Sequence, residues 1–121
     1  MKKVIMVVDD AMTNLATAKK ALQNNYTVFT APSAEVMFGI LEKRLPQLIL
    51  LDIEMPVTNG YEALTALKND PRYKAIPVVF LTAHDDDDTR VKCMNLGSAD
   101  FISKPFDEQG LLETVKTFAV L

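Results

Sequence analysis

The sequence predicts an α/β domain in which helices cover both faces of a parallel β-sheet. Five short apolar runs recur along the 121 residues, and stretches with helical spacing separate them. The first, third and fourth runs, at 4–8, 48–51 and 78–81, are apolar at every position instead of alternating. Strands with apolar residues on both sides are typical of parallel sheets that are packed between two helical layers.

The remaining elements follow from the same spacing. Two further strands are expected at 26–29 and 100–102. Five apolar stripes predict one helix after each strand: Leu15, Ala18 and Leu22; Val36, Ile40 and Leu41; Tyr61, Leu64 and Leu67; Val91 and Met94; and Leu111, Leu112, Val115, Phe118 and Ala119. Ser33 is expected to cap the second helix, Gly60 to open the third and Gly97 to end the fourth. Five β–α units with short connections result.

Composition restricts the class of protein. A length of 121 residues suits one domain, expected to span 1–121, although such a chain could be a whole protein or a piece of a longer one. A net charge of -3 without clustered Lys and Arg argues against a nucleic-acid surface. No apolar run approaches the roughly 20 residues of a membrane span. Cys93 is the single cysteine, which excludes an internal disulfide, and we expect it to be a small buried hydrophobe in a cytoplasmic protein.

Polar residues follow four of the five predicted strands. Asp9 and Asp10 end the first strand, Asp52 the third, Thr82 the fourth and Lys104 the fifth. The carboxyl ends of parallel strands lie at one edge of the sheet, where open α/β sheets bind their ligands. We therefore expect these five side chains to converge in one crevice.

Three carboxylates in one crevice need a cation. Each pair at about 4 Å costs about 4 kcal/mol at an effective dielectric constant near 20. Carboxylate oxygens and water are the ligands that Mg²⁺ prefers, and Lys104 adds a mobile positive charge. A metal ion, a carboxylate, an ammonium group and the Thr82 hydroxyl are what phosphoryl transfer to an aspartate requires. Asp52, on the middle one of the three strands that carry the acids and Thr82, is the predicted acceptor.

Four sequence blocks fall at the ends of predicted strands. The blocks are Val8-Asp9-Asp10; Asp52-Ile53-Glu54-Met55-Pro56 with Asn59-Gly60; Leu81-Thr82-Ala83-His84; and Asp100-Phe101-Ile102-Ser103-Lys104-Pro105-Phe106. Together they resemble the receiver domain of two-component response regulators, including the chemotaxis receivers. They occur in the family's order over the whole chain. The resemblance implies a doubly wound, five-stranded parallel sheet of the flavodoxin-like (β/α)₅ type.

The resemblance also implies a role for each metal-site residue. Asp10 would bind Mg²⁺ directly, whereas Asp9 would act mainly through water or by its charge. Asp52 would be both a metal ligand and the phosphoacceptor. Glu54 would offer its backbone carbonyl to the metal. The resemblance thereby assigns these four acidic residues to one phosphoacceptor and its metal-binding neighbours.

Further roles are implied for the residues that would contact the phosphoryl group and transmit the signal. Thr82 would donate a hydrogen bond to the acyl phosphate, and Lys104 would pair with a phosphoryl oxygen; both count with Asp52 as catalytic residues. The Lys104–Pro105 peptide bond is expected to be cis. Phe101 falls at the position of the switch aromatic, where tyrosine is frequent, so a switch here would be steric. His84 is expected to be an exposed loop residue.

The function that this resemblance implies is a phosphorylation-dependent switch. A sensor histidine kinase or a histidine phosphotransfer domain would supply the phosphoryl group. Output would pass to another protein through the fourth helix, the fifth strand and the fifth helix, without membrane or nucleic-acid binding. The chain would not be an enzyme beyond catalysing its own phosphorylation and slow dephosphorylation.

Two other functions fit parts of the pattern. A phosphatase working through an aspartyl phosphate would need a second acid, and Glu54 lies two residues after Asp52, but nothing in the sequence resembles a substrate cap. A phosphate-independent interaction module could retain the acids unused, although both Asp52 and Lys104 are present. A flavin-binding protein of the same topology is rejected, because no loop rich in Gly, Ser and Thr follows the first strand.

Overall fold

The computed structural model describes residues 2–119 and contains one five-stranded sheet in the order β2-β1-β3-β4-β5. All four neighbouring pairs of strands are parallel, and β3 lies at the centre. The strand order is that of a doubly wound sheet, which confirms the predicted fold class. The strands are β1 (Val4–Val8), β2 (Thr27–Ala31), β3 (Leu48–Asp52), β4 (Val78–Thr82) and β5 (Asp100–Ser103).

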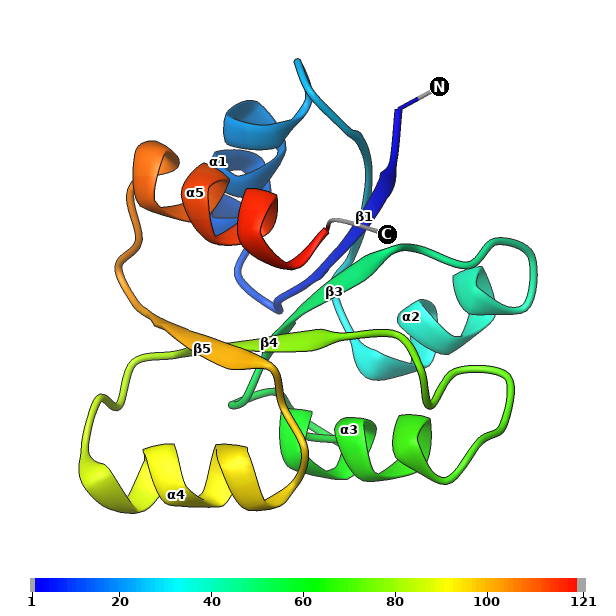
Figure 1. Cartoon of the computed structure of the whole chain (residues 1–121), viewed down its shortest axis with the longest axis vertical. Coiled ribbons are helices and arrows are strands. Elements are labelled where there is room, and N and C mark those ends of the chain that lie inside the picture. Colours follow the sequence, from blue (N-terminus) through cyan, green and yellow to red (C-terminus); the bar gives the residue numbers. More distant parts are fainter. Residues whose placement is uncertain (1, 120–121) are drawn as a thin grey trace.

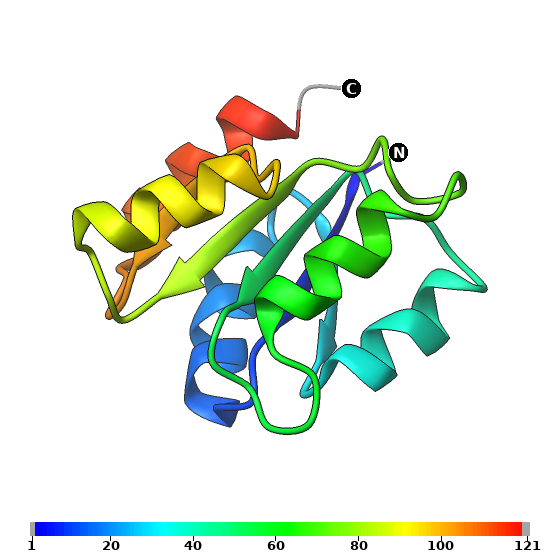
Figure 2. The same cartoon turned by 90° about the horizontal axis from the view of Figure 1, so that it is seen from below.

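One helix follows each strand, and the helices form a layer on each face of the sheet (Figure 1). On one face lie α1 (Met12–Leu22) and α5 (Glu108–Phe118). On the other face lie α2 (Ala34–Leu41), α3 (Gly60–Lys68) and α4 (Asp87–Asn95), which Figure 2 shows in a row in front of the strands. Among residues 2–119, every helix is too short or too polar to cross a bilayer.

The two helical layers explain the continuously apolar strands. All five residues of β1, β3 and β4 are buried. Successive side chains point to opposite faces of a sheet. In β1, Ile5 and Val7 therefore pack into the core beneath α1 and α5, whereas Met6 and Val8 pack into the core beneath α2, α3 and α4. Both cores are apolar, so a polar side chain in these strands before the strand end would be buried without water.

The predicted start and stop signals lie at the helix ends. Ser33 caps α2 by accepting a hydrogen bond from the Val36 N–H. α3 begins at Gly60, preceded by Asn59, which forms a reciprocal capping box with Glu62. Gly97 follows α4 with φ +93°, a left-handed conformation that favours glycine. α3 is thus anchored at its first turn.

Three predicted core positions are wrong. Val36 is 42% exposed, because α2 turns Ala34, Met37 and Leu41 toward the sheet instead. Val91 and Met94 of α4 are 56% and 73% exposed. The only buried residue of α4 is Cys93, which confirms the expectation for the cysteine. In a short helix with few apolar residues, the spacing of Val91 and Met94 does not say which side faces the protein.

Gly60 lies where the chain permits no side chain, and this gives a first prediction. A Cβ atom there would lie 2.3 Å from the Asp52 carbonyl oxygen and 2.8 Å from the Ile53 Cα. Gly60→Ala is expected to lower the free energy of unfolding by about 1–3 kcal/mol, because backbone must move. Urea unfolding followed by circular dichroism measures this change.

Gly39→Ala is the matched control. No atom lies within 4 Å of a Cβ built at Gly39 in α2. This substitution should raise the free energy of unfolding by about 0.5–1 kcal/mol, the ordinary helical advantage of alanine. Equal effects of the two substitutions would contradict the close packing of Gly60 on β3.

Candidate functional site

Three aspartates meet at the carboxyl edge of the sheet. Asp9 and Asp10 follow β1, and Asp52 is the last residue of the adjacent β3. One oxygen from each carboxylate lies within 4.8 Å of the other two. Asp9 and Asp52 are buried, whereas Asp10 is exposed. The spacing is small enough for the three groups to share one cation.

Lys104 joins two of these acids. Its Nζ lies 2.7 Å from Asp52 Oδ1 and 3.0 Å from Asp9 Oδ2. The lysine follows β5, and its backbone N–H donates to the Thr82 carbonyl at 2.7 Å, which continues the pairing of β5 with β4. The Lys104–Pro105 peptide bond is cis. The structure therefore brings together Asp9, Asp10, Asp52 and Lys104, from three strands.

Asp9 is held by two further donors that the sequence did not reveal. Its Oδ1 accepts from the Ala11 N–H at 2.9 Å, and its Oδ2 accepts from Asn14 Nδ2 at 3.1 Å. With Lys104, three donors fix this buried carboxylate in place. Asn14 is in the first turn of α1, five residues after Asp9, a spacing that could have indicated the contact. Exposed Asp10 has the more accessible carboxylate.

Burial and neighbouring charges shift the pKa values of Asp52 and Lys104. Removal from water raises the pKa of Asp52 from 3.8 to about 6; the Lys104 hydrogen bond opposes the rise, and the Asp9 charge adds to it. Burial alone would lower the pKa of Lys104, but its hydrogen bonds to Asp52 and Asp9 outweigh that effect and raise it. Lys104 therefore stays charged at neutral pH. With a pKa of about 6, Asp52 is mostly ionised there.

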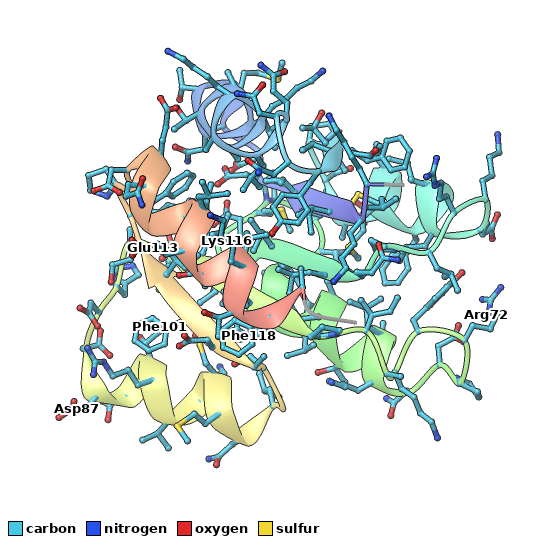
Figure 3. All side chains as sticks on the ribbon, turned by 45° about the horizontal axis from the view of Figure 1, so that its top comes forward. Arg72, Asp87, Phe101, Glu113, Lys116 and Phe118 are labelled. Atoms are coloured by element: carbon cyan, nitrogen blue, oxygen red, sulfur yellow. The ribbon has the colours of Figure 1, made fainter. Side chains whose placement is uncertain are left out.

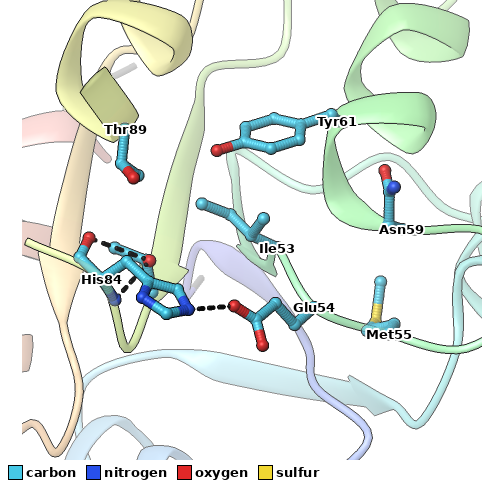
Figure 4. A pocket seen from close by; sticks show the side chains of 8 residues that line it. Ile53, Glu54, Met55, Asn59, Tyr61, His84 and Thr89 are labelled. Atoms are coloured by element: carbon cyan, nitrogen blue, oxygen red, sulfur yellow. Dashed lines mark hydrogen bonds and ion pairs between the residues drawn. The ribbon is translucent and has the colours of Figure 1, made fainter. Parts of the chain in front are cut away.

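Thr82 and the loop after β4 border the acids on the other side. The Thr82 hydroxyl donates to the His84 carbonyl at 3.1 Å and accepts from the His84 N–H at 2.9 Å. The His84 imidazole Nε2 faces Glu54 Oε1 (Figure 4). The His84 side chain is more than half exposed, as expected, but this contact with the loop after β3 was not predicted.

A cavity of about 450 Å³ opens beside this contact (Figure 4). Its walls come from the loops after β3 and β4 and from the first turns of α3 and α4. The lining residues are Ile53, Glu54, Met55, Asn59, Tyr61, Thr82, His84 and Thr89. Thr82 thus lies between the acids and an open space into which neighbouring groups can move.

The loop that carries Glu54 is fixed at both ends. The Gly60 N–H donates to the Ile53 carbonyl at 2.7 Å, and the Thr58 hydroxyl donates to Glu35 of α2 at 2.7 Å. Between these contacts, Val57 is 92% exposed and has φ +69°. A β-branched residue in the left-handed region costs about 1–3 kcal/mol. The loop therefore keeps its conformation against local strain.

Phe101 lies beside α4. Its ring is partly exposed on β5 and lies between β5 and α4 (Figure 3). The Arg90 guanidinium carbon of α4 lies 5.0 Å from the ring centre. No pattern in the sequence indicates this cation–π contact, because the two residues are in different elements.

Comparison with known proteins identifies the family and the fold of the chain. The family model described as the response regulator receiver domain matches residues 5–116. The chain is 35% identical over 114 residues to the response regulator PleD of Caulobacter vibrioides, with 93% of the chain and 25% of PleD covered. It is 31% identical to protein PilH of Pseudomonas aeruginosa, with 92% and 93% covered. The chain belongs to the response regulator receiver domain family.

Solved structures agree with this assignment. The chemotaxis protein CheY4 of Vibrio cholerae superposes with a TM-score of 0.92 at 25% sequence identity, over 98% of this chain and 99% of CheY4. The chain spans only about a quarter of the length of PleD, whereas it matches nearly all of PilH. Receiver domains are phosphorylated by sensor histidine kinases and signal to downstream partners. The cluster of Asp9, Asp10 and Asp52 fits the phosphorylation site of such a domain.

The raised pKa of Asp52 predicts a pH-dependent stability. The pKa of Asp52 is about 6 in the folded chain and an ordinary 3.8 in the unfolded chain. Between pH 3.8 and pH 6, Asp52 is therefore protonated in the folded chain but ionised in the unfolded one. The contribution of Asp52 to stability is present below about pH 4 and lost as the pH rises through about 6. Without Mg²⁺, the stability of Asp52→Asn relative to wild type should therefore rise by about 2–3 kcal/mol between pH 4 and pH 7.

Urea unfolding of both proteins in chelator-containing buffer at each pH measures this difference. A difference that stays constant, or that shrinks as the pH rises, would contradict the account of Asp52 as a carboxylate whose burial opposes its ionisation.

Proposed function

We propose that this chain is a phosphorylation-dependent switch that accepts a phosphoryl group on Asp52. The donor is a phosphohistidine of a sensor histidine kinase or of a histidine phosphotransfer domain. The observation that carries the proposal is the contact of Lys104 with Asp52 at 2.7 Å inside the cluster of three aspartates. This contact supports the proposal, because it holds a positive charge beside the carboxylate that would attack the phosphorus.

The residues divide the work of the transfer. The Asp52 carboxylate attacks the phosphorus, with the phosphohistidine nitrogen as the leaving group. Lys104 pairs with a phosphoryl oxygen, because its ammonium group is held beside the Asp52 carboxylate on a flexible stem. Thr82 donates its hydroxyl proton to another phosphoryl oxygen. Water later hydrolyses the acyl phosphate and returns the Asp52 carboxylate.

The donor set suits Mg²⁺. Three ionised carboxylates against one ammonium group leave a local charge of about -2, and oxygen ligands of this kind favour a small divalent cation. Asp10 and Asp52 would bind the ion directly, with the Glu54 backbone carbonyl, and Asp9 would act through water or by its charge. When bound, Mg²⁺ neutralises charge that develops on the phosphoryl oxygens. The hydrogen bonds that occupy Asp9 support its indirect role.

Output is proposed to pass through the surface formed by α4, β5 and α5. Phosphate contacts to Thr82 and Lys104 favour one arrangement of these elements, and Phe101 moves with them as the switch aromatic. Exposed Val91 and Met94 on α4 offer apolar contacts to a protein partner. We propose a single cytoplasmic domain over residues 1–121, without nucleic-acid or membrane binding.

The phosphatase alternative is weaker. It requires Glu54 as a general acid aimed at the nucleophile, but the Glu54 side chain faces His84 on the neighbouring loop. We therefore propose no enzymatic turnover of external substrates; the chain catalyses only its own phosphorylation and slow dephosphorylation.

Asp52→Asn is predicted to abolish labelling. Acetyl phosphate with Mg²⁺ should add one phosphoryl group to the wild-type chain, and mass spectrometry should map it to Asp52. The substitution removes the nucleophilic oxygen, so no label should form. Asp87→Asn, at an exposed acid of α4, is the control and should label at the wild-type rate. Full labelling of the Asp52→Asn variant would refute the acceptor assignment, and multiple turnovers would favour a phosphatase.

A further inference from the structure

The helix α4 is weakly attached to the rest of the domain. Cys93 is its only buried residue, and Val91 and Met94 face outward. Helices with few buried apolar contacts shift at low cost in free energy. The position of α4 therefore depends strongly on the polar and cation–π contacts that its side chains make with neighbouring elements.

Arg90 makes two of these contacts. Its Nε and Nη2 both donate to Asp85 Oδ1, at 3.0 and 2.7 Å. The same guanidinium lies over the Phe101 ring, with 5.0 Å between its carbon and the ring centre. Figure 3 shows the ring in the space between β5 and α4. Arg90 thus connects the loop before α4 to the aromatic side chain of β5.

The loop that carries Asp85 is fixed by the Thr82 hydroxyl. Thr82 bonds both the N–H and the carbonyl of His84, the residue directly before Asp85. A threonine hydroxyl has one proton to donate. When Thr82 donates that proton to a phosphoryl oxygen, it can no longer donate it to the His84 carbonyl. The loop then loses a contact that holds Asp85 in position.

We propose that Asp85, Arg90 and Phe101 form a latch that holds α4 and the ring in the unphosphorylated arrangement. The latch opens when Thr82 turns toward the phosphoryl group, the loop shifts, and Asp85 no longer orients the guanidinium over the ring. This inference rests on the proposed phosphorylation of Asp52. It adds a specific restraint to the switch: the Arg90 guanidinium, and not only the size of the ring, sets where Phe101 lies.

Reciprocal coupling follows from this arrangement. A contact that stabilises the unphosphorylated arrangement must also disfavour phosphorylation by the same factor. Breaking the latch should therefore move the Phe101 ring without any phosphate. If phosphorylation proceeds from the unlatched arrangement, its rate rises with the population of that arrangement, so labelling of Asp52 should also be faster. One exposed cation–π contact corresponds to a change of about two- to fivefold.

Arg90→Met tests the latch, because methionine keeps much of the aliphatic stem and removes the charge and the donors. Lys92→Met is the matched control: Lys92 is a cation of the same helix, but it lies over Tyr61, 4.3 Å from the ring centre. The readouts are the NMR signals of ¹³C-labelled phenylalanine rings, assigned with Phe101→Leu, and the initial rate of labelling by acetyl phosphate with Mg²⁺.

In the phosphate-free state, the Phe101 signals of Arg90→Met should shift toward the positions they take in phosphorylated wild type. Labelling should be about two- to fivefold faster. Asp85→Asn, which weakens the hold on Arg90 without touching the ring, should shift the signals in the same direction by less. Lys92→Met should match wild type in both measurements.

Unchanged Phe101 signals in Arg90→Met would overturn the latch, as would an equal shift in Lys92→Met. The spectra of the unphosphorylated proteins do not depend on labelling. They therefore test whether Arg90 holds the Phe101 ring even if the wild-type chain takes no label. A wild-type chain that takes no label on Asp52 would overturn the proposed function, and with it the release of the latch by phosphate.

Discussion

The contact of Lys104 with two buried carboxylates is the interaction on which the site depends. Asp9 and Asp52 lie at the ends of adjacent strands, where their mutual repulsion would be costly without a cation. The ammonium group of Lys104 lies between them at hydrogen-bonding distance from both. It relieves only part of the negative charge, because exposed Asp10 lies beside the pair. The crevice therefore remains able to attract a divalent cation and, with it, a phosphoryl group.

The parallel sheet makes this arrangement possible. Strands β1, β3 and β4 are buried on both faces, so their first polar residues fall at the strand ends and face the same edge. Gly60 lets α3 approach the backbone of Asp52 closely. The loops after β3 and β4 then meet through Glu54 and His84. A rigid centre is thus bordered by loops and by α4, an element with a single buried side chain. This contrast suits a switch in which the carboxylate site stays fixed while α4 changes position.

The sheet and the five polar residues at its edge could be predicted because each depends on one local pattern. Apolar runs locate the strands; Asp52 and Thr82 directly follow such a run, and Lys104 follows one after a single serine. Contacts between elements distant in the sequence left no local pattern: Glu54 facing His84, and Arg90 over Phe101. The exposed side of α4 was also mispredicted, because Val91 and Met94 have helical spacing but face outward. The positive φ of Val57 was not visible either, because glycine or asparagine, not valine, signals that conformation.

Anomalous scattering from a crystal grown with Mn²⁺, a substitute for Mg²⁺, tests the central claim most directly. The account predicts one strong peak in the crevice, with carboxylate oxygens of Asp10 and Asp52 at about 2.0–2.3 Å from the ion. Lys104 should remain near the acids in the same crystal. An empty crevice at saturating Mn²⁺, or an ion that binds elsewhere on the chain, would contradict the claim that these three carboxylates form a site for a single cation.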